Sequence, residues 1–355
     1  RAARYDLLVQ AAQQCNAAII LTGHTADDQV ETYLMRRERE TEPAGIVGEG
    51  RGLAAMATQT LLQNTIMLCR PLLSLWREEL RVFLRRKNIV WADDPSNENT
   101  AYERPRIRHF AKTLDKAVLF AEAGAAAQKR RADNHRIADL LTRARDHSTL
   151  LSGDGLLLSA GWNEQAKDLM PLTLAFLLAA VGGQSFLPSL QDCAVLADWL
   201  QATPLGAKQR RTLHHCVIEI SSNGMVIRRE RRNLPVMRVQ SGQQVLWDGR
   251  YLIRNKTDAV LDIAAPDERQ LSAYLHEHEI ESTQAQREIW LSVPAIFRDG
   301  CLTEIPALSR TVPQSAVISL ERILACFDRV LSGHDFEVAL AVKALLTMHF
   351  NHNCR

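Results

Sequence analysis

Two acidic side chains three positions apart could hold a positively charged ligand. Asp28 and Glu31 come shortly after residues 17–22, whose apolar composition predicts a buried strand. Thr25 can cap a helix that runs to about Arg37, and both carboxylates would then lie on one helical face. The helix macrodipole favours the ionised carboxylates near the first turn. We therefore expect an anionic pair suited to an ammonium group or Mg²⁺, at the sheet edge where open α/β sheets bind ligands.

Two other interpretations of this acidic segment stay open. Thr25 followed by Asp27 and Asp28 is also the pattern of an ordinary, well-capped helix without a binding role. His24 next to two Asp residues would fit a metal-dependent hydrolase, but the sequence offers no second His cluster, so we predict no resident metal site.

A second segment places Arg at every second position, in Arg104, Arg106 and Arg108. Residues 94–97 (Asp-Pro-Ser-Asn) predict a turn before it. Because proline disfavours helical geometry in the preceding residue, we expect Pro105 to keep Arg104 ahead of the next helix. There its planar guanidinium could hold a carboxylate or a phosphate through two hydrogen bonds. The alternative is the solvated start of a basic helix.

The basic residues are concentrated in the middle of the chain. Residues 70–145 contain 17 Lys and Arg against 10 Asp and Glu, a local excess of 7 in a chain of net charge +2. Such a surface beside an acidic pocket suits a polyanion with a small cationic co-substrate. Its densest cluster is Lys129, Arg130 and Arg131. A second basic strip could contact RNA or could simply be solvated: Lys208, Arg210, Arg211, Arg228, Arg229, Arg231 and Arg232.

The order of predicted elements favours an α/β fold. Helix, strand and helix follow each other closely over residues 5–37, and residues 65–69 predict a second buried strand before a helix capped by Ser74. Further patterns predict helices at 102–147, 165–181, 190–201 and 336–350, and a hairpin around residues 223–224. We expect a catalytic domain over 1–112, a helical linker over 113–150, a helix-and-hairpin domain over 151–235 and an α+β domain over 236–355.

Composition excludes several classes of protein. The 355 residues are 46% hydrophobic and 24% charged, which excludes wholesale disorder. The longest apolar runs are too short to cross a bilayer. The seven Cys show no CxxC pair, which argues against a disulfide scaffold or a structural zinc site and favours a reducing cytoplasm.

Three motifs together resemble the tRNA(Ile)-lysidine synthetase family, whose members contain an ATP-pyrophosphatase (PP-loop) domain. They are GHTADDQVET at residues 23–32, RPLL at 70–73 and WADDPSNENTAYERPRIR at 91–108, and residues 52–56 match the family's Gly-Leu-x-x-Met segment. The resemblance implies a parallel-sheet, Rossmann-like catalytic domain, a helical linker and a C-terminal tRNA-binding region.

The resemblance also implies an activity, substrates and residue roles. Family enzymes use ATP, with Mg²⁺, to adenylate the wobble cytidine of an isoleucine tRNA with a CAU anticodon. They then attach free L-lysine through its side-chain amine, which changes AUG reading to AUA. Asp28, Glu31 and Arg104 would be catalytic, and His24 and Asp27 would complete the substrate pocket. The residues expected to contact RNA are Arg106, Arg108, Lys112, Lys129, Arg130 and Arg131.

The sequence also departs from the family pattern. The family's Ser-Gly-Gly-x-Asp-Ser phosphate loop does not occur in these 355 residues, and we expect it before Arg1. Because that loop forms a backbone nest for pyrophosphate, we expect this chain alone not to bind ATP normally. Pro105 replaces the usual Asn, and a polar insert spans residues 38–50. Two alternatives follow: a PP-loop enzyme that thiolates cytidine, for which the Cys spacing is unsuitable, or a catalytically inert tRNA-binding fragment.

Overall fold

The structure is a computed structural model that describes residues 2–39, 45–92, 103–145, 148–151, 154–162, 166–308 and 317–347. The predicted turn at 94–97 and part of the polar insert lie outside these residues. The described chain forms two compact units. Unit 1 comprises Arg1–Arg136 and Arg329–Glu337, and unit 2 comprises Ile137–Asp328 and Val338–Arg355.

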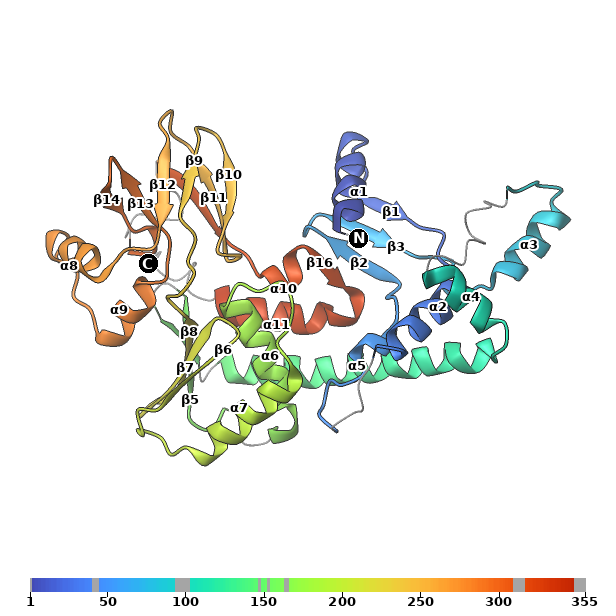
Figure 1. Ribbon diagram of the computed structural model, residues 1–355, viewed down its shortest axis with the longest axis horizontal. Helices are drawn as coiled ribbons and strands as arrows, with labels where there is room; N and C mark the ends of the chain where they lie inside the picture. The colour runs from blue at the N-terminus through green and yellow to red at the C-terminus, as the bar shows by residue number, and fades with distance from the viewer. Residues whose placement is uncertain are drawn as a thin grey trace. The chain divides into compact units, whose positions relative to one another are not determined.

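Unit 1 contains a four-stranded sheet in the order β1-β3-β2-β16 (Figure 1). Its strands are β1 (Ile19–Leu21), β2 (Gln59–Leu62), β3 (Ile66–Cys69) and β16 (Val330–Ser332). Its helices are α1 (Ala2–Gln14), α2 (Ala26–Arg37), α3 (Arg77–Arg86), α4 (Glu103–Ala111) and the first part of α5 (Lys116–Ala144). Two short 3-10 helices complete it, η1 (Arg51–Ala54) and η6 (Gly333–Asp335).

The sheet of unit 1 is mixed. β1 pairs with β3 in parallel, while β2 pairs antiparallel with β3 and with β16. Both predicted strands exist, and β2 was not predicted. The predicted burial of the first strand is wrong, because Ile19 and Leu21 are exposed. The reason is that β1 is an edge strand whose only described neighbour is β3.

Helix packing fixes α2 against α4. Val30 and Leu34, one turn apart on α2, are buried with Ile107 and Ala111 of α4 and with Leu119 of α5. These apolar positions recur at intervals of four, so each helix turns one continuous apolar stripe toward the others. Charged side chains also join the two helices: Arg104 and Arg108 of α4 donate to acidic side chains of α2.

The segment between β3 and α3 corrects one expectation. α3 begins at Arg77 with Trp76 as its N-cap residue, not at Ser74. The chain turns at residues 71–75 instead, and the Leu75 carbonyl accepts a hydrogen bond from the Ala26 amide at 2.9 Å. Glu79 accepts from the Trp76 amide at 2.6 Å, so the N-cap amide is satisfied by a side chain three residues later. The turn therefore joins the end of β3 to the start of α2.

Unit 2 contains three antiparallel sheets and several helices. One sheet comprises β4 (Ser148–Leu151), β5 (Gly155–Ser159), β8 (Gly224–Arg229), β7 (Cys216–Ser221) and β6 (Arg210–Leu213). Another comprises β14 (Cys301–Glu304), β13 (Ala295–Arg298), β12 (Leu261–Ala264) and β9 (Met237–Val239), and the third β10 (Gln244–Trp247), β11 (Tyr251–Asn255) and β15 (Ile318–Arg322). The helices are η4 (Lys167–Leu169), α6 (Met170–Val181), α7 (Leu190–Ala202), α8 (Glu268–Glu277), α9 (Gln284–Trp290), η5 (Pro306–Leu308) and α10 (Ala325–Asp328), while α11 (Phe336–Thr347) begins in unit 1.

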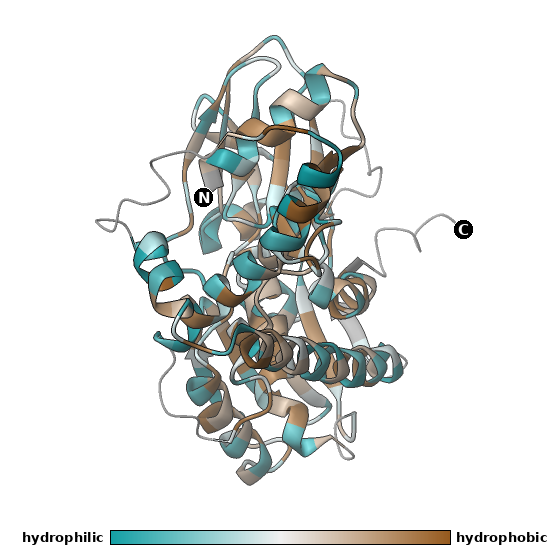
Figure 2. Ribbon diagram, turned by 90° about the vertical axis from the view of Figure 1, so that its right-hand side faces the viewer, coloured by the Kyte–Doolittle hydropathy of each residue, from teal (hydrophilic) through white to brown (hydrophobic). Residues whose placement is uncertain are grey.

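The helix α6 is almost wholly buried and is the most apolar segment of unit 2. It packs on α7 and on β8, so the apolar side chains around α6 are buried against protein. None of the helices in the described ranges is both long and apolar enough to cross a membrane. Hydrophobic and hydrophilic residues are interspersed along the ribbon (Figure 2). The helix predicted at 165–181 is present as η4 followed by α6, with residue 165 outside the described residues. The predicted helix at 190–201 and the hairpin around residues 223–224 are confirmed.

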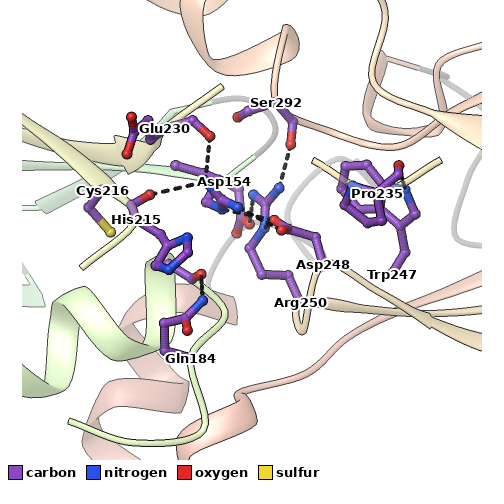
Figure 3. A network of polar contacts seen from close by, with 12 residues as sticks. Asp154, Gln184, His215, Cys216, Glu230, Pro235, Trp247, Asp248, Arg250 and Ser292 are labelled. Atoms are coloured by element: carbon purple, nitrogen blue, oxygen red, sulfur yellow. Dashed lines mark hydrogen bonds and ion pairs between the residues drawn. The ribbon is translucent and has the colours of Figure 1, made fainter. Parts of the chain in front are cut away.

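A fully buried ion-pair network lies inside unit 2 (Figure 3). Arg250 is 0% exposed and donates to Asp248 at 2.7 Å, to Asp154 at 3.0 Å and to the Ser292 carbonyl. Arg322 donates to the other oxygen of Asp154 at 2.7 Å. We name these residues, with Arg229, the buried Arg250 network.

The buried Arg250 network corrects part of the second basic strip. Arg229 is buried and holds both oxygens of Asp248, at 2.8 and 3.0 Å. Arg228 is also buried and pairs with Glu288 at 3.1 Å. These two arginines therefore do not present a surface for RNA, because strand β8 turns both of them into the protein.

Candidate active site

The acidic pair lies at the start of α2, where the chain leaves β1. Thr25 is the N-cap residue, and its backbone amide and its hydroxyl both donate to Asp28 Oδ2, at 2.8 and 3.0 Å. Asp28 thus belongs to the helix cap, as the simpler interpretation of the sequence required. Only Oδ2 of Asp28 accepts these capping hydrogen bonds, and Oδ1 accepts a hydrogen bond from an arginine of α4. The capping and binding interpretations of Asp28 are therefore compatible.

The partner is Arg104, which bridges the two carboxylates. Arg104 donates from one terminal nitrogen to Asp28 Oδ1 at 2.8 Å and from Nε to Glu31 Oε2 at 2.9 Å. Arg108, one turn further along α4, donates from Nε to Glu31 Oε1 at 2.6 Å. The geometry brings three predicted site residues, Asp28, Glu31 and Arg104, into one contact. It also joins Arg108, which was predicted to contact RNA, to Glu31.

The position of Arg104 in the chain differs from the expectation. Arg104 lies within the first turn of α4, which begins at Glu103, rather than ahead of the helix. Pro105 is tolerated there because amides of the first helical turn have no partner inside the helix. As a result Arg104 and Arg108 are four residues apart on one face and both reach Glu31, whereas Arg106 is exposed on the other side.

Burial divides this site into a buried part and a solvent-exposed part. The side chain of Glu31 is 2% exposed and that of Asp28 is 13% exposed, so both carboxylates are held inside the unit. Arg104 is 41% exposed, and Arg108 is 26% exposed. Hydrogen bonding to Glu31 raises the pKa of Arg108 and outweighs its partial burial. The most solvent-accessible of these charges is therefore the guanidinium that bridges both acids.

Asp27 points to a different set of partners. Its Oδ1 accepts from Lys116 Nζ at 2.8 Å, and its Oδ2 accepts from the Arg77 amide at 2.9 Å. Burial alone would raise the pKa of Asp27, but the hydrogen bonds from Lys116 and from the Arg77 backbone lower it below the usual value. Asp27 therefore ties α2 to α3 and α5 as a permanent carboxylate beside the Asp28–Glu31 pair.

His24 lines the end of β1 and is half-buried. Its Nδ1 lies 2.9 Å from the Thr22 hydroxyl oxygen. Burial lowers the pKa of His24, and the charges of Arg70 and Arg104 lower it further against the opposing effect of Asp28. At neutral pH the imidazole is accordingly uncharged and adds no repulsion for a cationic ligand.

The six residues predicted to contact RNA fall into two groups. Arg106, Lys112, Lys129 and Arg131 are exposed. Arg108 is engaged with Glu31, and Arg130 donates from Nε to Asp335 at 2.9 Å while its side chain is 16% exposed. These internal partners favour a structural role for Arg108 and Arg130.

Two side chains that bond α2 to residues 52–56, Gln29 and Arg36, were not predicted from the sequence. The Gln29 side chain bonds the Met56 backbone twice, donating to the carbonyl and accepting from the amide, both at 2.8 Å. Arg36 donates to the carbonyls of Gly52 and Ala55, at 2.5 and 2.9 Å. The match of residues 52–56 to the Gly-Leu-x-x-Met motif could have indicated these contacts, because Gln29 and Arg36 of α2 both bond the backbone of this segment. Across the described ranges, no group of three or more His, Cys, Asp or Glu could hold a metal ion.

Comparison with known proteins now defines the class. The PP-loop domain family matches residues 1–113, which contain β1, α2, α4 and the site between the two helices. The predicted ATP-pyrophosphatase α/β fold is therefore confirmed, with mixed helix and sheet content beyond it. A PP-loop domain implies that the protein uses ATP.

Relatives that match nearly the whole of this chain narrow the class to one family. The chain is 39% identical to the tRNA(Ile)-lysidine synthase of Brucella anthropi, over 97% of this chain and 75% of that protein. It is 37% identical to the enzymes of the same name from Brucella suis and Brucella canis, over 98% of this chain and 76% of each. The chain belongs to the tRNA(Ile)-lysidine synthase family, which confirms the resemblance seen in its motifs.

Proposed function

We propose that the protein joins L-lysine to the wobble cytidine of an isoleucine tRNA with a CAU anticodon, giving lysidine and changing AUG reading to AUA. The observation that carries this proposal is the hydrogen-bonded contact of Asp28 and Glu31 with Arg104 at the carboxyl end of β1. It is supported by the lysidine synthase relatives. Because the proposed substrates are tRNA and free lysine, we propose that the reaction takes place in the cytoplasm.

Lysine binding would proceed by exchange of one cation for another. The lysine ammonium takes the position of the Arg104 guanidinium next to Asp28 and Glu31, and Arg104 turns to hold the lysine carboxylate. The local charge stays balanced, because the ammonium that enters replaces the guanidinium that leaves. Arg104 can make this movement since it is 41% exposed, whereas Arg108 keeps Glu31 oriented throughout.

The same carboxylates would assist the nucleophile. A lysine amine has a pKa of about 10.4, so it must lose a proton before it attacks. Asp28 or Glu31 at hydrogen-bond distance can accept that proton as a general base. A neutral His24 and the anchored Asp27 form the wall of the pocket and keep the amine in one orientation, which contributes through proximity.

ATP would transfer its adenylyl group to the cytidine C2 oxygen with release of pyrophosphate, and the lysine amine would then bond to C2 and displace that oxygen as AMP. The Ser-Gly-Gly-x-Asp-Ser loop that forms the phosphate nest in this family does not occur in the 355 residues. Residues 45–50 form turns that follow α2 rather than a strand, and η1 behind them is held by side chains. For Mg²⁺ we propose an ion carried by the nucleotide phosphates, since the described residues provide no cluster of three ligands.

For tRNA we propose phosphate contacts by the exposed members of the basic stretch. Arg106 and Lys112 lie on and just after α4, and Lys129 and Arg131 are exposed on α5. Neutralised phosphates would supply salt-dependent affinity, while a single unstacked anticodon base supplies specificity.

The decisive test is incorporation of labelled L-lysine into CAU-anticodon tRNA by the full-length protein in the presence of ATP and Mg²⁺. We expect Asp28→Asn to lower incorporation at least about 100-fold, because the amide can neither balance the ammonium charge nor accept its proton. The matched control is Asp262→Asn, a half-exposed carboxylate paired with Arg238 in unit 2, which should retain full incorporation. Undiminished incorporation by Asp28→Asn would remove Asp28 from the mechanism.

A further inference from the structure

A short segment of the C-terminal half, residues 329–337, is part of unit 1. Its strand β16 pairs antiparallel with β2 through Leu331 and Leu61. The turn after β16 is tight, because a Cβ on Gly333 would lie 2.9 Å from the Gln59 carbonyl oxygen. Gly333 begins η6, and the last residue of η6, Asp335, accepts a hydrogen bond from Arg51 of η1.

Asp335 is the centre of a compact polar cluster. Its Oδ1 accepts from Arg51 at 2.7 Å, from Arg130 Nε at 2.9 Å and from Asn134 at 2.8 Å, and its Oδ2 accepts from Arg130. The side chains of Asp335 and Arg51 are 13% and 12% exposed. One carboxylate thus neutralises two arginines that would otherwise face each other, and Arg130 also donates to the Arg51 carbonyl at 3.0 Å. Removing Asp335 would leave two adjacent cations with little solvent to screen them.

A continuous series of contacts leads from Asp335 to the acidic pair. Arg51 is the first residue of η1, and Arg36 donates to the carbonyl of Gly52 in η1 and to that of Ala55, the residue after η1. The next contact in the series joins the Met56 backbone to the side chain of Gln29, which lies between Asp28 and Glu31 on α2. The carboxylates themselves make no contact with Asp335. Their orientation depends on where α2 lies, and α2 is bonded to residues 52–56 by Gln29 and by Arg36.

We propose that Asp335 is a positioning residue for lysine binding, which acts through Arg51, η1 and Gln29 to set α2 so that Asp28 and Glu31 face the same ligand. The proposal rests on the proposed function for its substrate. It assigns a role in the active site to a residue about 300 positions from Asp28 and Glu31 in the sequence. It also explains why Arg130, in the predicted RNA-binding cluster, is turned inward.

The test compares Asp335→Asn with the wild-type full-length protein at a temperature where both are folded. We expect the KM for L-lysine to rise about five- to tenfold, tRNA affinity to stay within about twofold, and hydrogen exchange of residues 26–37 and 51–56 to accelerate. A purely structural role would lower the amount of active enzyme, and so the apparent kcat, but would leave KM unchanged. An unchanged lysine KM in Asp335→Asn would overturn the proposal.

Two further variants locate the effect. Arg329→Ala is the control in the same segment, because Arg329 pairs with Asp6 of α1 at 2.9 Å and does not contact η1, so its lysine KM should match the wild type. Gln29→Leu interrupts the same series of contacts, so combining it with Asp335→Asn should raise KM no further than the larger single effect. Fully additive effects would contradict a shared path.

The exchange measurement separates this proposal from the proposed function. If the wild-type protein incorporates no lysine, the function is wrong, and exchange alone then decides whether Asp335 controls α2. Unchanged exchange of residues 26–37 in Asp335→Asn would overturn the positioning role, whatever the substrate is.

Discussion

The Asp28–Glu31 site of unit 1 and the buried Arg250 network of unit 2 use the same chemistry for different ends. In each, one arginine bridges two carboxylates. At the site the bridging Arg104 is 41% exposed, while in the network Arg250 is 0% exposed. A cation that reaches solvent can be exchanged for a ligand. A cation without solvent, whose donors are all bonded to protein, can only hold elements together.

The hydrogen bonds of Arg250 show that its guanidinium is held entirely by protein. Arg250 donates from all three nitrogens to Asp248, Asp154 and the Ser292 carbonyl. Burial raises the pKa of Tyr251, which lies against this network, so its hydroxyl stays protonated. The surroundings of Arg250 therefore leave no place for a ligand, and we assign this network to the stability of unit 2.

Matched substitutions should break the comparison most clearly. Asp154→Asn removes the carboxylate shared by Arg250 and Arg322, and leaving two buried arginines undercompensated should cost about 3–5 kcal/mol of unfolding free energy. Asp28→Asn should cost about 1 kcal/mol or less, because Arg104 can turn to solvent. Chemical denaturation of both variants measures the difference. Equal losses would contradict the division into a fixed network and an exchangeable site.

A second prediction concerns pH and the cluster around Asp335. Burial lowers the pKa of His334 to about 4, assisted by Arg130 and Arg131 against the opposing charge of Asp335. The unfolded chain binds this proton below about pH 6.5, whereas the folded protein does so only near pH 4. The contribution of neutral His334 is thus fully present above about pH 6.5 and is lost as the pH falls toward 4.

His334→Gln tests this pH dependence. The variant cannot titrate at this position, so its Tm should fall less between pH 7 and pH 5 than the Tm of the wild type. Asp28→Asn serves as the comparison, since it leaves His334 in place and should keep the wild-type slope. Parallel pH profiles for His334→Gln and the wild type would show that this imidazole does not contribute.

The smallest effect on stability is expected at the exposed cations. Arg106→Glu together with Lys112→Glu should leave Tm unchanged, because neither side chain is buried. tRNA affinity should fall about three- to tenfold with a shallower salt dependence, and the lysine KM should remain as in the wild type. Filter binding at several salt concentrations measures this. Arg130 is unsuitable for such a test, because its substitution would also break the pair with Asp335.

The sequence predicted the local features of the site well. The strand before residue 23, the Thr25 cap and the shared face of Asp28 and Glu31 all follow from short-range rules, and the structure confirms them. Ser74 as a cap and Arg104 ahead of its helix were wrong. In both cases a local preference was overruled by contacts from elsewhere: the Leu75 carbonyl bonds Ala26, and Glu31 holds Arg104 on the first turn of α4.

Side-chain burial was the feature that short-range rules could not supply. Arg229 and Arg106 carry the same charge in basic stretches, yet Arg229 lies inside unit 2 with Asp248 and Arg106 is exposed. Whether an arginine contacts RNA, a ligand or a buried acid depends on which residues pack around it.

The amino-acid order alone determined which groups are charged, where the helix around Asp28 begins and to which family the motifs point. These properties depend on neighbours within about one helical turn. The tertiary structure decided that Arg104 bridges both acids, that Arg250 is closed off from water and that Asp335 is joined to α2. Those outcomes depend on residues distant in the chain that folding brings within hydrogen-bond range, where exclusion of water determines whether a charge is exchangeable or fixed.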